Sequence, residues 1–489
     1  GLLDSLFIVA LFYKVHDEVK NRREAVRIVI QRMGRACLFT SVSTAIGFGA
    51  FAFTKLPLMR EFGLILAFGV LIAFVSSIIW MPALLCVLPA PRRGYTNRRL
   101  FRWISSLLGG VDRLTTRRRW PIIVGGLCVL SVSIVIGASR SYISIPYLKE
   151  LPQNIEGMQG VNLLSDHLLG CISTAVTVNG QPDSMQNPEV LRALDQLDKW
   201  AEKQEIVKSS LSPSDVIREL HRAFNGGDPD FDRVPNDRSL IAQYLAILDP
   251  HTRSDFITDD YARTHLRIVT LDVGSREWRR SLLRPLMKRA RKLLQGYKLE
   301  FTGSSRAGLV GMEHVVHQML WGFLWAFGII VVLVGVAFRS VRLALLALVP
   351  NLLPPMVCFA TLAALGVTLR LGTTTFLCVA VGISFDNTIH LFSSIREARS
   401  RGLDHTSAIT EALGSIGPPI VYTSVLITAG FGVFVLSEFE MLRAFGLTCA
   451  GMVIVAALAD LLLTITLLRL ARRALAPGIP RAEPSTSGE

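Results

Sequence analysis

Three groups that can accept, donate or shuttle a proton lie within about one turn of a single apolar segment. In GISFDNTIH, Asp386 is followed directly by Asn387 and, at i+4, by His390, so the acid and the imidazole share one helix face. A carboxyl group near the middle of a bilayer costs about 3 kcal/mol on insertion scales, so such residues usually face a bundle interior and have a function. The pattern predicts a proton-handling site. The alternative is a polar cluster that only holds helices together.

An internal repeat predicts a second acid at a matching place. Residues 34–85 align without a gap on residues 417–468, and Asp4 in GLLDSLF corresponds to Asp386 after a shift of one residue in the polar loop between them. The recurring residues are Thr40, Ser41, Gly47, Phe48, Gly49, Arg60, Phe62 and Gly63 in the first copy and Thr423, Ser424, Gly430, Phe431, Gly432, Arg443, Phe445 and Gly446 in the second. Repeated helix bundles are typical of secondary transporters.

Further polar residues are predicted to support the acids. Thr423 and Ser424 begin the span after Asp386 at a similar depth, and we expect them to hydrogen-bond its carboxylate. Asp460 lies in the last span, where the first copy has Ser77. It is either part of a proton relay or a solvated residue near the inner interface.

Glycines and prolines predict how these spans pack. The triplets Gly47–Gly49 and Gly430–Gly432 favour close helix packing, with backbone flexing as the alternative. Pro350, Asn351 and Pro354 lie within one span, where proline frees backbone carbonyls. We expect a hinge or a simple structural kink there.

Composition sets the class of protein. A hydrophobic fraction of 51% and a mean hydropathy of +0.43 over 489 residues indicate a polytopic α-helical membrane protein, because roughly 20 apolar residues span a bilayer. We predict eight complete spans and a fragment of a ninth at residues 1–13. The complete spans are expected near residues 37–54, 61–88, 120–138, 319–338, 342–364, 371–395, 417–437 and 444–470.

The net charge of +14 indicates topology and not nucleic-acid binding, because much of it lies in short loops between spans. The basic loops are expected to be cytoplasmic, which places the long segment 141–316 outside. The predicted organisation is first-repeat helices at 1–90, a cytoplasmic basic loop with an amphipathic helix at 91–119, a helix opening the second repeat at 120–140, an external domain at 141–316, a second-repeat bundle of five helices at 317–472 and a disordered cytoplasmic tail at 473–489.

Two of these segments have a pattern of their own. In the external domain, strands expected at Ile172–Val178, near Ile206, at His265–Val273 and at Lys298–Gly303 alternate with helices, which predicts an α/β domain of split βαβ type. In the basic loop, one face of the expected helix is apolar, so we expect it to lie along the inner membrane surface. That face comprises Leu100, Ile104, Leu107, Leu108 and Val111, opposite Arg98, Arg99, Arg102 and Asp112.

The sequence contains no phosphate-binding glycine loop, metal-ligand cluster or nucleophile triad. An enzyme, an ATP-driven pump and a cofactor or metal requirement are therefore disfavoured.

The segment GISFDNTIH after VPNLLPP, followed by TSV, GFG and FG, resembles the resistance-nodulation-division (RND) superfamily. The likeness is greatest to its hydrophobe and lipid exporters of the large mycobacterial membrane protein (MMPL) and sterol-sensing type. The resemblance implies twelve spans in two repeats, of which this chain would cover the second half of the fourth to the twelfth, so we expect it to be truncated at its N-terminus. It also implies export from the inner membrane powered by proton entry, with coupling at Asp4 and Asp386.

The implied partners are membrane lipids, a hydrophobic small-molecule or lipid substrate, protons, and a second copy of the chain or a periplasmic adaptor. The chain departs from the family pattern at Ser5 and Asn387, where lipid exporters often have Tyr, so sodium coupling is an alternative. A second hypothesis is a sterol-sensing or lipid-sensing module that does not transport.

Overall fold

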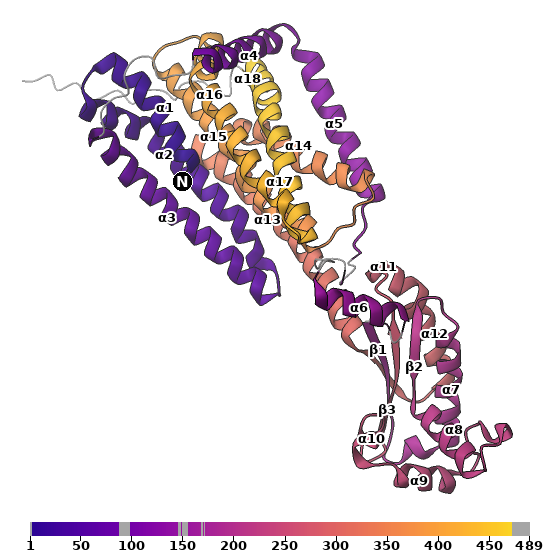
Figure 1. Cartoon of the computed structure of the whole chain (residues 1–489). Helices are drawn as coiled ribbons and strands as arrows, with labels where there is room; N and C mark the ends of the chain where they lie inside the picture. The colour runs from indigo at the N-terminus through magenta and orange to yellow at the C-terminus, as the bar shows by residue number, and fades with distance from the viewer. Residues whose placement is uncertain are drawn as a thin grey trace, which may run out of the picture. The chain divides into compact units, whose positions relative to one another are not determined.

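A computed structural model describes residues 2–87, 98–144, 148, 155–167, 170 and 172–471. It divides into two compact units, one formed by Gly1–Tyr142 with Val315–Glu489 and the other by Ile143–His314 (Figure 1). The tail predicted at 473–489 and the start of the basic loop at 91–97 lie outside the described residues. Each unit is described separately below.

The first unit is a helix bundle. Among the described residues, eight helices are long and apolar enough to cross a membrane, which confirms the predicted fold class. Four of them are single helices: α3 (Pro57–Val87), α5 (Arg119–Arg140), α14 (Val341–Ala364) and α15 (Leu371–Ser400). A fifth, Gly308–Phe338, consists mostly of α13 (Gly311–Phe338). The other three join consecutive segments: Arg22–Phe53 is α2 (Arg22–Gly49) with η1 (Ala50–Phe53), His405–Leu436 is α16 (His405–Gly432) with η7 (Val433–Leu436), and Glu440–Leu470 is α17 (Glu440–Leu458) with η8 (Ala459–Thr464) and α18 (Ile465–Leu470). The shorter α1 spans Leu2–Val19.

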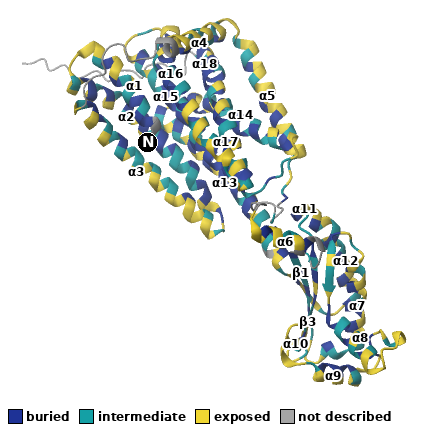
Figure 2. Ribbon diagram, in the orientation of Figure 1, coloured by how far each residue is buried: buried dark blue, intermediate teal, exposed yellow. Residues whose placement is uncertain are grey.

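Helix α15 is enclosed by the rest of the bundle. In the most apolar stretch of α15, 89% of the residues are buried inside the protein. The corresponding buried fractions are 11% in α3 and 22% in α5, which form outer edges of the bundle (Figure 2). Small residues make this possible: a Cβ on Gly47 of α2 would lie 2.9 Å from the backbone nitrogen of Gly382 in α15. Ile65 on α3 and Val135 on α5 are 70% and 65% exposed, as expected of side chains that face lipid.

The sequence repeat is also a structural repeat. Each copy ends a long helix in a short 3-10 turn, η1 or η7, and the next helix crosses that turn closely. A Cβ on Gly63 would lie 2.4 Å from the Phe51 Cβ, and a Cβ on Gly446 would lie 2.4 Å from the Phe434 Cβ. The two glycines therefore permit the same tight corner in both copies.

The amphipathic helix of the basic loop, α4 (Arg98–Arg117), contacts protein as well as the bundle's surroundings. It lies across one end of the bundle (Figure 1), where Leu108 packs against Gly417 of α16. Ile104 and Leu108 are buried, and Asp112 pairs with the buried Arg469 of α18. Part of the apolar stripe thus packs against α16, and the position of this helix along the inner membrane surface stays a prediction.

The second unit contains one four-stranded antiparallel sheet in the order β2-β3-β1-β4. The strands are β1 (Ile172–Asn179), β2 (Val207–Leu211), β3 (Arg263–Thr270) and β4 (Lys298–Thr302). Helix α7 (Pro188–Glu202) connects β1 to β2, and α12 (Arg284–Leu293) precedes β4. This order and connectivity are those of a split βαβ fold.

The sheet and its helices share one core. Alternate residues of β1 and β3, including Val176, Val178, Leu266 and Ile268, are buried against α7 and α12. The helices α6 (Glu156–His167), α8 (Pro213–Phe224) and α9 (Arg238–Ile247) complete the described part of this unit together with several shorter turns.

We predict that Gly63→Ala destabilises the bundle by about 1–3 kcal/mol, because the added methyl group overlaps Phe51 in a corner that cannot expand. Thermal unfolding of the purified protein in detergent measures this. Gly69→Ala, on the same helix but in open space, should leave the unfolding midpoint unchanged or slightly raised. Equal loss in both variants would contradict the tight corner.

The second unit should have a pH-dependent stability that depends on Asp198. This side chain is 2% exposed, and burial, reinforced by the nearby Asp215 carboxylate, raises its pKa from 3.8 to about 7. The folded state therefore keeps a proton that the unfolded chain has lost, and stability decreases as pH rises across this range. Hydrogen exchange of α7 amides between pH 4 and 7 measures this decrease. Asp198→Asn should flatten it, and an unchanged slope would contradict the assignment.

Candidate functional site

Helices α1, α2 and α15 bring the two repeat-related acids to one interface. The Asp4 carboxylate accepts hydrogen bonds from Thr40 Oγ1 (3.4 Å) and Ser41 Oγ (3.3 Å), and the Thr40 side chain also lies beside Asp386. All four side chains are buried. Because a threonine hydroxyl has a single hydrogen, Thr40 can donate to only one acceptor at a time, either the Asp4 carboxylate or the Cys37 carbonyl of its own helix (3.0 Å). A protonated carboxyl group can instead donate a hydrogen bond to the Thr40 oxygen.

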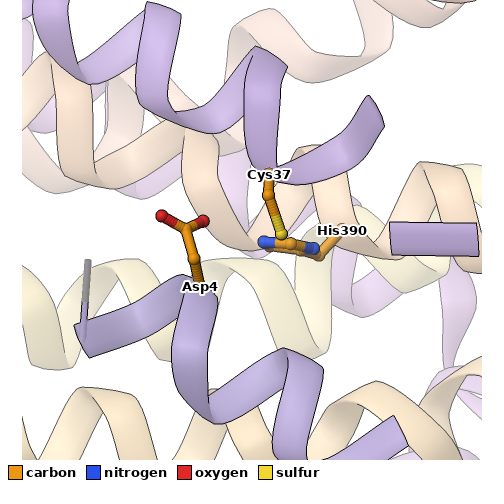
Figure 3. Close-up of side chains that lie close together, drawn as sticks. All are labelled: Asp4, Cys37 and His390. Atoms are coloured by element: carbon orange, nitrogen blue, oxygen red, sulfur yellow. The ribbon is translucent and has the colours of Figure 1, made fainter. Parts of the chain in front are cut away.

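An imidazole adjoins this pair. His390 is fully buried and stacks on Phe7 with ring centroids 3.9 Å apart. Figure 3 shows His390 of α15, Asp4 of α1 and Cys37 of α2 converging, and their ligand atoms lie within 4.8 Å of one another. Neither ring nitrogen of His390 has a hydrogen-bond partner among the described residues. Buried polar atoms are normally paired, so an unpaired imidazole beside a carboxylate is available for proton exchange.

The same three side chains are of the types that hold zinc. However, the two Asp4 oxygens already accept hydrogen bonds from the Thr40 and Ser41 hydroxyls, so both have partners without a metal. We therefore interpret the trio as a hydrogen-bonded cluster.

A second polar cluster surrounds Asp460, on the other side of α15. Its Oδ1 accepts hydrogen bonds from Thr388 of α15 (2.7 Å) and from Thr464 (3.2 Å). Asn351 of α14 donates to the Thr388 hydroxyl (3.1 Å), and the Asn387 side chain lies near Asp460. Asp460 is 2% exposed, which contradicts the alternative of a solvated interfacial residue. Its role in a relay stays a prediction.

Asp460 lies in a π-helical segment, η8. Such segments inside α-helices widen one turn and are frequent at functional sites. Here η8 places Asp460 and Thr464 so that both face the same hydrogen-bonded cluster.

The structure corrects the expected partners of Asp386. Thr423 donates its hydroxyl to the Ile420 carbonyl in its own helix (3.1 Å), and neither Thr423 nor Ser424 hydrogen-bonds Asp386. The residue beside Asp386 is Thr40 of the first copy. Sequence periodicity puts both threonines at the right depth but does not determine which one faces α15.

The glycine prediction was partly wrong. Gly47 packs closely against Gly382 of α15, where an added Cβ would not fit. A Cβ on Gly49, Gly430 or Gly432 would meet nothing within 4 Å, so these three glycines have no close packing partner among the described residues.

The proline-containing helix α14 is continuous, with Pro350, Pro354 and Pro355 inside it. A hinge there stays a prediction. Asn351 has a more specific place than expected, because its amide donates both to Thr388 and to the Ala347 carbonyl (2.7 Å).

Several residues of the site were not anticipated: Phe7, Cys37, Thr388 and Thr464. The alignment of the two repeats contained one indication that Asn387 and Asp460 lie close together. Ser5 and Ser77 occupy the equivalent positions in the first copy, and their hydroxyls hydrogen-bond at 3.4 Å. The polar contact beside Asp460 therefore has a weaker counterpart in the first copy.

Comparisons with known proteins give the following matches. The family described as "MMPL family" matches residues 5–125 and 179–484. The "Putative membrane protein MJ1562" of Methanocaldococcus jannaschii is 21% identical over 336 residues, covering 66% of this chain and 84% of that protein. The "Probable transport protein MmpL12" of Mycobacterium tuberculosis is 24% identical over 204 residues, covering 40% of this chain and only 17% of that protein. "Protein dispatched homolog 3" of Gallus gallus is 31% identical over 83 residues, which cover 17% of this chain and 6% of that protein.

The two copies offer a matched pair of variants. Thr40→Val removes a hydroxyl that supports buried carboxyl groups, and we expect it to destabilise the protein by about 1–3 kcal/mol. Thr423→Val removes the equivalent hydroxyl, which bonds only within its own helix, and should have a much smaller effect. Thermal unfolding in detergent compares them. If both variants lose the same stability, the Thr40 site has no special role.

Proposed function

This chain belongs to the MMPL family, and we propose that it exports hydrophobic or amphipathic molecules, such as lipids, hopanoid-like or sterol-like compounds or drugs, using proton entry as the energy source. The family match confirms the resemblance that GISFDNTIH and VPNLLPP carry. The protein is a multi-pass membrane protein, and the basic loops favour the cytoplasmic membrane as its location.

One observation carries the proton-coupling proposal: Asp4 and Asp386 are buried at a single interface and interact with the same threonine. Protonation of either acid cancels a buried negative charge. The protonated carboxyl group can then donate a hydrogen bond to the Thr40 oxygen, which it could not do as a carboxylate. A change of this kind alters the packing of α1 and α2 against α15. Helix α15 also carries Thr388 and Asn387, which connect the same change to Asp460 and α14.

A cavity in the bundle supports a hydrophobic cargo. It measures about 400 Å³ and lies between α14 and α17, with Val357, Leu362 and Leu447 in its apolar lining. Arg443 and Glu440 also line it, so one part of it is charged. A cavity with these two parts suits an amphipathic molecule. The external unit would take up or release cargo on the far side of the membrane, alone or with an adaptor or a second copy of the chain.

We predict that Asp386→Asn abolishes proton-coupled export, because an amide keeps the shape of the side chain but cannot take up the proton. The assay is proton influx into vesicles, followed with a pH-sensitive dye, together with export of a fluorescent amphiphile. Glu61→Gln, which removes an exposed carboxylate on α3, is the matched control and should retain both activities.

Three outcomes would contradict the proposal in different ways. Unchanged export by Asp386→Asn would remove the coupling assignment. Export driven by a sodium gradient and not by a proton gradient would show that sodium is the coupling ion. Lipid-dependent changes in the wild-type protein with no export at all would favour a lipid-sensing module.

A further inference from the structure

A strongly basic cavity opens at the predicted cytoplasmic end of the bundle, away from both polar clusters. It measures about 470 Å³ and lies between α2, the turn from α13 to α14, and α15. Four arginines line it, Arg32, Arg35, Arg339 and Arg396, together with a single acid, Glu397. Helix α2 belongs to the first repeat and the other elements to the second, so the cavity lies where the two repeats meet.

The charges in this cavity are not balanced by the protein. Arg32 pairs with Glu397 at 3.1 Å, and Arg396 donates to the Phe338 carbonyl at 3.3 Å. Within the part of the chain that the structure describes, Arg35 and Arg339 form no ion pair. Arg35, Arg339 and Arg396 are exposed at the mouth of the cavity, and four guanidinium groups around one carboxylate give it a net positive charge that attracts an anion.

Arg339 is also unusual in its backbone. It has a φ of +48°, in the left-handed region that glycine or asparagine adopts more easily. The turn between α13 and α14 thereby contributes the Arg339 side chain to the lining of the cavity.

We propose that this cavity binds the phosphate of an anionic phospholipid from the inner leaflet, such as phosphatidylglycerol. Guanidinium forks match phosphate oxygens in geometry and charge, and basic pockets between membrane helices on the cytoplasmic side suit such headgroups. The cavity wall continues into apolar side chains, Ala36, Phe39 and Phe338, which suit the glycerol and the first part of the acyl chain. A lipid is favoured over free phosphate because Val336 and Val341, on either side of Arg339, are 68% and 74% exposed, as at a lipid-facing surface.

A lipid bound there contacts both repeats at once. It therefore joins α2 to α15 and to the turn between α13 and α14. This inference does not depend on proton coupling or on export.

The test uses the purified chain in phosphatidylcholine nanodiscs that contain a minor fraction of phosphatidylglycerol. Lipid retained by the protein is counted by native mass spectrometry, and thermal unfolding is recorded with and without phosphatidylglycerol. We expect selective retention of phosphatidylglycerol and a higher unfolding temperature in its presence. In the double variant Arg35→Gln with Arg339→Gln, the amount of retained phosphatidylglycerol should fall at least about tenfold, because two charge-assisted contacts are lost.

Arg27→Gln is the matched control, because it removes the same charge from an exposed position on α2 outside the cavity. It should retain the lipid as the wild type does. Arg339→Gly, which fits the backbone of the turn and removes only the side chain, provides a second variant if the double variant unfolds. Equal loss in Arg27→Gln, full retention in the cavity variants, or binding of inorganic phosphate without preference for phosphatidylglycerol would overturn the proposal.

Discussion

A carboxyl group inside a membrane must be shielded from hydrocarbon, and in this protein the shielding of Asp4 and Asp386 determines how three helices pack. Thr40 and Ser41 of α2 hydrogen-bond Asp4 of α1, and Thr40 also reaches Asp386 of α15. Close approach of α2 and α15 at Gly47 and Gly382 brings these groups into range. The polar contacts thus depend on small residues one to two turns away as much as on the acids themselves.

The internal repeat provides the same scaffold twice, but the two copies are used differently. Both copies form the corner at Gly63 or Gly446, where phenylalanine packs directly on the glycine backbone. In both copies the recurring threonine donates to a carbonyl of its own helix, and in the first copy it also hydrogen-bonds the buried Asp4. The acids, His390 and Cys37 consequently gather at the α1, α2 and α15 interface. The chemistry is asymmetric although the helices that support it are repeated.

Much of the fold follows directly from the sequence, because hydropathy determines where helices can span and alternation determines strands such as Ile172–Asn179. The i+4 spacing predicts that Asp386 and His390 share a helix face, and in the structure His390 adjoins Asp4 of the first copy; a joint role in proton handling stays a prediction. Periodicity identifies a helix face but not its neighbour, so it could not show that Thr423 bonds within its own helix or that Leu108 packs against Gly417. The π-helical segment at Asp460 has no local sequence signal, and the openness of Gly430 depends on which helix lies opposite.

We propose that Asp4 and Asp386 titrate as one unit at the interface of α1, α2 and α15. Infrared spectroscopy of the aspartate carboxyl bands as a function of pH measures this coupling, with Asp386→Asn used to assign the Asp386 band. We expect the Asp386 band to titrate at a different pH in Asp4→Asn than in the wild type, because the two nearby charges are coupled. An Asp386 titration that is unchanged in Asp4→Asn would contradict it.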